Sequence, residues 1–131
     1  MAPTGCILLA DDDRVDAKAF VRAVARLASA APVTIVRDGV EAWELLSPVG
    51  GMRPAMIVLD INMPRMNGLE LLRRIRDDAR FARTPVFIMT TSDDEGDRLD
   101  ALELNVAGYI VKSHLDDGLS RALELAFPVL A

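Results

Sequence analysis

The stretch that decides the fold lies at residues 55–60 and reads Ala-Met-Ile-Val-Leu-Asp. Its first five residues form an apolar run that is short for a helix, and its last residue is a carboxylate. Such a run is typical of a parallel strand that is buried on both faces. Other short runs rich in Val, Ile or Leu lie at residues 6–10, 33–37, 86–89 and 108–111. We therefore expect five strands, each buried on both faces.

Longer segments with helical periodicity separate these runs. One of them places Leu69, Leu72 and Ile75 on a single helical face. Helices are expected from Asp13 to near residue 31, from residue 38, from residue 67, over about 94–104, and over about 115–127. The alternation of strands and helices indicates an α/β protein with a doubly wound parallel sheet, and we expect residues 1–131 to form one domain.

Composition narrows the class of protein. The 131 residues are 51% hydrophobic and 27% charged, with a net charge of −5, which argues against disorder. No apolar stretch approaches the roughly 18 residues of a spanning helix, and the N-terminus does not resemble a secretory signal, so we expect a cytoplasmic protein. Lys and Arg are scattered in an acidic chain, which disfavours nucleic-acid binding. The single cysteine, Cys6, is expected to be a buried apolar residue.

Polar residues follow the predicted strands. They are Asp11-Asp12-Asp13, Asp60, Thr90-Thr91-Ser92 and Lys112-Ser113. Because ligands of an open parallel sheet bind outside the carboxyl ends of its strands, we expect these groups to meet at one edge. Each alone has an ordinary explanation: a helix cap for the aspartate triplet, a turn for Asp60, and solvated side chains for the threonines and the lysine.

Together these residues indicate a metal site that handles phosphoryl groups. Asp11, Asp12 and Asp60 would repel one another unless a cation joined them, and oxygen ligands without histidine or cysteine suit Mg²⁺. Lys112 and Thr90 add a positive charge and a hydroxyl donor for phosphoryl oxygens. The predicted chemistry is transfer of a phosphoryl group to a carboxylate beside Mg²⁺.

Four sequence blocks carry a resemblance to a known family. They lie at residues 7–13, 58–68, 90–92 and 108–112. In this order and at these strand ends, they resemble the receiver domains of two-component response regulators along essentially the whole chain. The resemblance implies a flavodoxin-like fold with five strands in the order 2-1-3-4-5 and five helices.

The resemblance also implies roles for the acidic residues. Asp60 would be the phosphoacceptor, taking its phosphoryl group from a phosphohistidine of a sensor histidine kinase. Asp12 would bind Mg²⁺ directly and Asp11 through water. Asn62 would offer its backbone carbonyl to the metal and turn its side chain toward the phosphoryl group. The protein would therefore be a signalling phosphoacceptor that assists its own phosphorylation and dephosphorylation, rather than an enzyme.

Other matching residues would respond to phosphorylation. Thr90 would move toward the new group, Lys112 would pair with it, and Tyr109 would change rotamer. Thr91 would lie near the phosphoryl group. Pro64 and Gly68 resemble the family's loop after the acceptor, in which glycine permits a close approach.

One position departs from the family pattern. Proline, in a cis peptide, usually follows the family's lysine, but Ser113 follows Lys112 here. A non-proline cis bond is costly, so this residue favours a trans peptide and a differently shaped loop, without deciding between cis and trans. We expect a single receiver domain without an output domain. Residues 77–84 with 90–92 resemble stand-alone receivers that serve phytochrome-type and other soluble sensor kinases. We also expect a homodimer through the fourth helix, fifth strand, fifth helix and the apolar tail at residues 126–131.

Alternatives remain at this stage. A small phosphatase of the haloacid-dehalogenase type also has an aspartate after an apolar strand, but it needs a second aspartate where Asn62 stands. A flavodoxin-like cofactor binder would need a glycine-rich phosphate loop, which is missing. A scaffold that is never phosphorylated would have no need of the phosphorylation residues.

Overall fold

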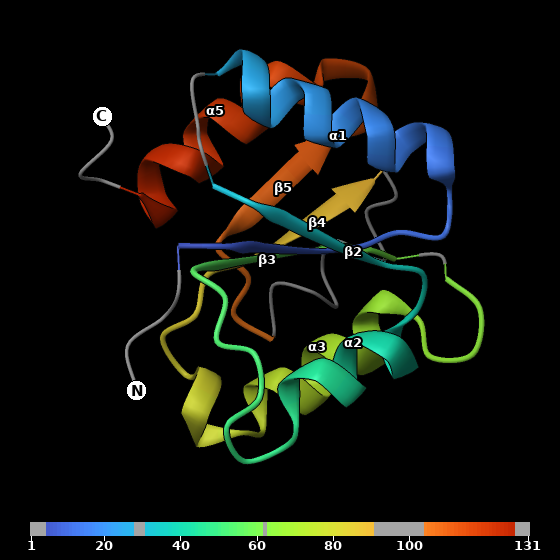
Figure 1. Ribbon diagram of the computed structural model, residues 1–131, viewed down its shortest axis with the longest axis vertical. Coiled ribbons are helices and arrows are strands. Elements are labelled where there is room, and N and C mark those ends of the chain that lie inside the picture. Colours follow the sequence, from blue (N-terminus) through green and yellow to red (C-terminus); the bar gives the residue numbers. More distant parts are fainter. Residues whose placement is uncertain (1–4, 28–30, 62, 91–103, 128–131) are drawn as a thin grey trace.

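The computed structural model describes residues 5–27, 31–61, 63–90 and 104–127. A parallel sheet of five strands in the order β2-β1-β3-β4-β5 forms its centre (Figure 1). The strands are β1 (Ile7–Ala10), β2 (Val33–Val36), β3 (Met56–Asp60), β4 (Val86–Thr90) and β5 (Gly108–Val111). This order confirms the predicted flavodoxin-like topology.

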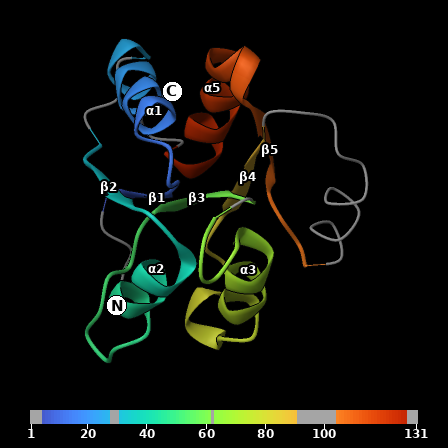
Figure 2. The ribbon, with the colours of Figure 1, turned by 90° about the vertical axis from the view of Figure 1, so that its right-hand side faces the viewer.

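Helices cover both faces of the sheet. The α-helices in the described part of the chain are α1 (Arg14–Arg26), α2 (Gly39–Leu46), α3 (Gly68–Arg76) and α5 (Leu115–Ala126). The short 3₁₀ helices η1 (Ala79–Phe81) and η2 (Lys112–His114) complete the list. Figures 1 and 2 show α1 and α5 together on one face and α2 and α3 together on the other.

The core consists of two clusters, one on each face of the sheet, because successive side chains of a strand point to opposite faces. Leu8 and Ile57 pack against α2 and α3, whereas Ile7 and Val58 pack against α1 and α5. Every residue of β1 and β3 is buried, because these strands lie inside the sheet and carry helices on both faces.

Side-chain caps start three helices at the carboxyl edge of the sheet. Asp13 accepts hydrogen bonds from the backbone N–H groups of Val15 and Asp16, and so begins α1. Asp38 and Asn67 cap α2 and α3 in the same way. The helix-cap explanation of the aspartate triplet is thus confirmed for Asp13.

Some sequence predictions need correction. The prediction that all strands are buried on both faces is wrong for the two edge strands of the sheet. In β2, Thr34 and Ile35 are exposed, and in β5 only Ile110 is buried. Helix α1 ends at Arg26 rather than near residue 31. Asp60 and Thr90 are the last residues of β3 and β4 rather than the residues after them.

Other expectations have mixed outcomes. The helix expected over about 94–104 falls almost entirely among residues 91–103, outside the described part of the chain, as does the tail at 128–131. Cys6 is buried, as expected. The described residues contain no cis peptide bond, so the peptide between Lys112 and Ser113, which the sequence left undecided, is trans. Within the same residues, no helix is long and apolar enough to cross a membrane.

Candidate functional site

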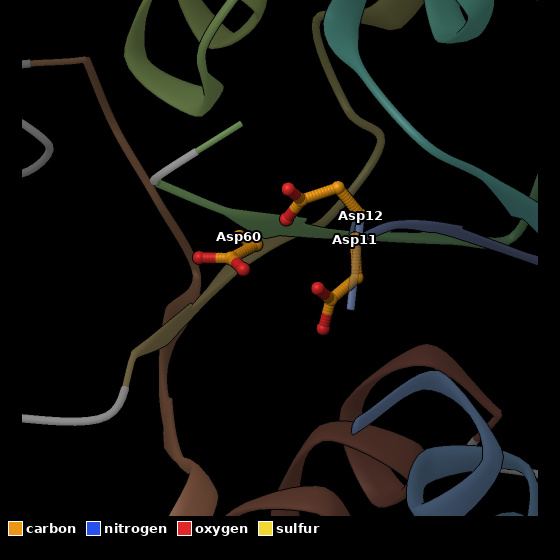
Figure 3. A group of neighbouring side chains, drawn as sticks. All are labelled: Asp11, Asp12 and Asp60. Atoms are coloured by element: carbon orange, nitrogen blue, oxygen red, sulfur yellow. The ribbon is translucent and has the colours of Figure 1, made fainter. Parts of the chain in front are cut away.

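The carboxyl ends of the central strands bring three predicted residues together. Asp11 and Asp12 follow β1, and Asp60 ends β3, which pairs directly with β1. Each of these carboxylates offers an oxygen that lies within 4.8 Å of the corresponding oxygens of the other two (Figure 3). Asp11 and Asp60 are buried, whereas Asp12 is exposed, so the cluster opens to solvent on one side.

Lys112 joins this cluster from the far side of β4. Its Nζ lies 3.1 Å from Asp60 Oδ2 and donates a hydrogen bond to it. The same Nζ lies 3.3 Å from Asp11 Oδ2. The trans backbone after β5 continues directly into η2, which begins at Lys112. The departure from the family pattern at Ser113 therefore leaves the lysine in the site.

The electrostatics of Asp11 are unusual. Burial raises its pKa, a hydrogen bond from the Asp13 backbone N–H and the charge of Lys112 lower it, and nearby Asp60 raises it again. The net result is a pKa of about 6. Burial alone would lower the pKa of Lys112, but hydrogen bonds and charge interactions with the surrounding aspartates raise it, so the lysine stays charged.

One buried oxygen in this cluster lacks a hydrogen bond. Asp11 Oδ2 has no hydrogen-bond partner, although the charge of Lys112 is near. An unsatisfied buried carboxylate oxygen is costly, and a water bound to a divalent cation at this cluster would donate a hydrogen bond to it. The donors are all hard oxygens, and the open side leaves room for metal-bound waters, so the residues present fit Mg²⁺.

The structure describes both of the predicted switch residues, Thr90 and Tyr109. Thr90 ends β4, between the strands that carry Asp60 and Lys112, and it is half-buried. Tyr109 lies on β5, half-buried against the core on the α2 and α3 side. Asn62 and Thr91 lie outside the described residues.

Sequence reasoning missed Asp16. This residue lies in the first turn of α1, and its Oδ2 is 2.6 Å from Lys112 Nζ. Acidic residues are common in the first turn of a helix, because their negative charge interacts favourably with the helix dipole. This ordinary explanation gave no reason to expect a contact with Lys112. The place of Asp16 in the first turn of the helix that follows the Asp11-Asp12-Asp13 triplet is a signal that could have indicated a position near the acidic cluster.

A second missed contact supports the loop after β3. The guanidinium of Arg65 contacts Asp38 Oδ2 through Nε at 2.9 Å and through a terminal nitrogen at 2.8 Å. The hydrogen bond from Gly39 N to Met66 O, 2.9 Å long, ties the same loop to the start of α2. Asp38 is buried but the Arg65 side chain is 56% exposed, so water shields the charge of the arginine and only the carboxylate is withdrawn from solvent.

Comparisons with known proteins agree with this geometry. The family model for the response regulator receiver domain matches residues 7–124. The chemotaxis protein CheY1 of Helicobacter pylori is 33% identical over 119 residues, which cover 91% of this chain and 94% of that protein. Response regulator Rcp1 of Synechocystis is 33% identical over 115 residues, which cover 85% of this chain and 78% of that protein.

Solved structures give the same result. The phosphorylated cyanobacterial phytochrome response regulator RcpA superposes with a TM-score of 0.83 and 30% identity, covering 98% of this chain and 96% of that one. The Mn²⁺-bound form of Rcp1 superposes with a TM-score of 0.80 and 28% identity, covering 91% of each chain. With the fold, the acidic cluster and the matched range in agreement, the chain belongs to the family of response regulator receiver domains.

Proposed function

We propose that this protein is the phosphoacceptor of a two-component phosphorelay and that Asp60 receives the phosphoryl group. The observation that carries this proposal is the hydrogen bond of 3.1 Å from Lys112 Nζ to Asp60 Oδ2, within a cluster of carboxylates that fits Mg²⁺. A carboxylate nucleophile next to a metal site and a fixed ammonium has what phosphoryl transfer requires: position and charge neutralisation.

The transfer step is a direct displacement. A carboxylate oxygen of Asp60 attacks the phosphorus of a phosphohistidine, the new P–O bond forms, and the P–N bond breaks with its electron pair returning to the imidazole. Asp12 and Asp60 would hold Mg²⁺ directly, Asp11 would hold it through water and Asn62 through its backbone carbonyl, and the ion would supply positive charge for the phosphoryl oxygens. Lys112, whose Nζ lies 3.1 Å from Asp60 Oδ2, would contact one of those oxygens.

The donor in this proposal is a sensor histidine kinase of the phytochrome type. Support comes from the solved structures that superpose on this chain, which include a bacteriophytochrome response regulator at 33% identity as well as RcpA. The match of the receiver-domain family model over residues 7–124 argues against the phosphatase and flavin-binding alternatives. A scaffold that is never phosphorylated would gain no phosphoryl group in the experiment that follows.

The decisive experiment is phosphorylation by a small donor. The protein is incubated with acetyl phosphate and Mg²⁺, and its intact mass is measured. We expect one added phosphoryl group on the wild type, none on Asp60→Asn, and none on the wild type in excess chelator. A wild type that gains no phosphoryl group from acetyl phosphate or from a phosphorylated kinase, or an Asp60→Asn variant that gains one, would contradict the proposal.

Thr90 and Tyr109 are proposed to report phosphorylation to partners. Contacts that exist only after transfer are the ones that shift a conformational equilibrium. Thr90→Ala should therefore accept a phosphoryl group from acetyl phosphate with a yield comparable to that of the wild type, while NMR shifts of the β5 residues on phosphorylation become smaller. Shifts equal to those of the wild type would show that Thr90 has no part in the response.

Dimerisation stays a prediction. The proposed interface includes β5 and α5 together with the predicted fourth helix and the C-terminal tail, which lie mostly outside the described residues. We infer that such a dimer would present the phosphorylation signal by contact.

A further inference from the structure

Lys112 makes its shortest charged contact with Asp16. The distance from Nζ is 2.6 Å to Asp16 Oδ2, against 3.1 Å to Asp60 Oδ2 and 3.3 Å to Asp11 Oδ2. The Lys112 side chain is 13% exposed and that of Asp16 is 31% exposed, so the pair is partly shielded from water. A charge-assisted hydrogen bond of this length in such a place is stronger than an ordinary surface ion pair.

We propose that Asp16 is a positioning residue that retains Lys112 in the unphosphorylated arrangement and so lowers the affinity of the site for a phosphoryl group. The inference rests on the proposed function, because it assigns a regulator to the acceptor site at Asp60.

Competition for the ammonium group is the first step of the argument. Lys112 has three N–H donors, and hydrogen bonds to Asp16 and Asp60 occupy two of them. A phosphoryl group on Asp60 brings three strong acceptor oxygens to the same place. A Lys112 that turns its N–H groups toward these oxygens weakens its bond to Asp16, and the energy of that bond then favours the unphosphorylated state.

Charge acts in the same direction. Asp16 adds a carboxylate to the border of a site that already holds Asp11, Asp12 and Asp60. A phosphoryl group carries more negative charge than the carboxylate it modifies, so a further anion nearby disfavours it. Asp16 does not belong to the group of carboxylates that lie within 4.8 Å of one another. Its replacement therefore leaves the candidate metal ligands in place.

The test uses beryllofluoride, a phosphoryl mimic that binds to a carboxylate. The full chain is titrated with it at a Mg²⁺ concentration that saturates each variant, and binding is followed by ¹⁹F NMR. Asp16→Asn, which is nearly isosteric, should bind beryllofluoride about fivefold more tightly than the wild type. Asp16→Ala gives a second measurement if the first variant is poorly folded, and circular dichroism checks both.

Asp13→Asn is the matched control. It removes the same charge from the neighbouring helix cap, it keeps a good N-cap residue, and its side chain bonds only backbone groups of the first turn in the described contacts. Its affinity should stay within about twofold of the wild type. If Asp13→Asn and Asp16→Asn increased the affinity for beryllofluoride equally, the effect would come from the loss of a negative charge in general. The contact between Asp16 and Lys112 would then have no specific role, and the inference would be overturned.

The remaining outcomes separate this inference from the proposed function. A purely structural role of Asp16 predicts weaker binding on substitution, because the site would lose its support. Unchanged or weaker binding by the Asp16 variants, with normal binding by the wild type, therefore overturns the positioning role alone. A wild type that binds no beryllofluoride contradicts the proposed acceptor site itself.

Discussion

Asp11→Asn should make the metal-free protein more stable at pH 7 by about 2–3 kcal/mol, and it should remove most of the stabilisation that Mg²⁺ gives. Asp11 is 1% exposed, its Oδ2 has no hydrogen-bond partner, and burial is the main cause of its raised pKa of about 6. Asparagine keeps an oxygen for the Asp13 backbone N–H but has no charge. Tm should rise by roughly 8 °C without metal.

The pH dependence has a definite sign. The pKa of Asp11 rises from 3.8 to about 6 on folding, so the folded protein binds this proton more tightly than the unfolded chain. The contribution of Asp11 to the stability of the metal-free wild type should therefore increase as the pH falls from about 7 through 6 toward 4. Asp11→Asn lacks this contribution. Thermal melts at pH 7 and pH 5, each with Mg²⁺ and with chelator, measure both effects.

Asp12→Asn provides the matched control for this prediction. Asp12 belongs to the same cluster but is exposed, so its replacement should change metal-free stability by no more than about 0.5 kcal/mol. It should nevertheless reduce stabilisation by Mg²⁺, as Asp11→Asn does. An Asp11→Asn variant that is less stable than the wild type without metal would show that the ionised carboxylate is not costly in this site.

The main features of the fold could be predicted because local and global signals agree. Residues 55–59 are apolar at every position, which fits a strand covered on both faces, and Asp38 and Asn67 cap helices where chain direction changes. The candidate site followed from the same pattern. Once the strands are parallel, Asp11, Asp60 and Lys112 must reach one edge.

The features that the sequence did not predict depend on tertiary neighbours. The exposure of Ile35 depends on β2 being an edge strand, which its own apolar run does not reveal. The contact between Asp16 and Lys112 joins residues 96 positions apart, and each residue has an ordinary local explanation. The ion pair of Arg65 with Asp38 similarly joins two loops. Periodicity describes faces of single elements, so contacts between loops escape it.

Gly68→Ala should be the most damaging single-methyl substitution near Asp60, the proposed acceptor. A Cβ at Gly68 would lie 2.4 Å from the backbone oxygen of Asp60 and 3.0 Å from Ile61 Cα. Both neighbours are backbone atoms, so either the start of α3 or the end of β3 must move. We expect a loss of about 3 kcal/mol in the free energy of unfolding, measured by urea denaturation at saturating Mg²⁺.

The same displacement should slow phosphorylation, because the backbone that must move carries Asp60. Small misplacements of reacting groups cost much of the rate, so we expect phosphorylation by acetyl phosphate to be at least about tenfold slower in the folded fraction. Gly5→Ala is the control, since a Cβ there would meet nothing within 4 Å. If Gly68→Ala matched Gly5→Ala in stability and rate, the close approach of α3 to the acceptor strand would have no mechanical importance. A loss of stability with a normal rate would show instead that α3 shifts while Asp60 keeps its place.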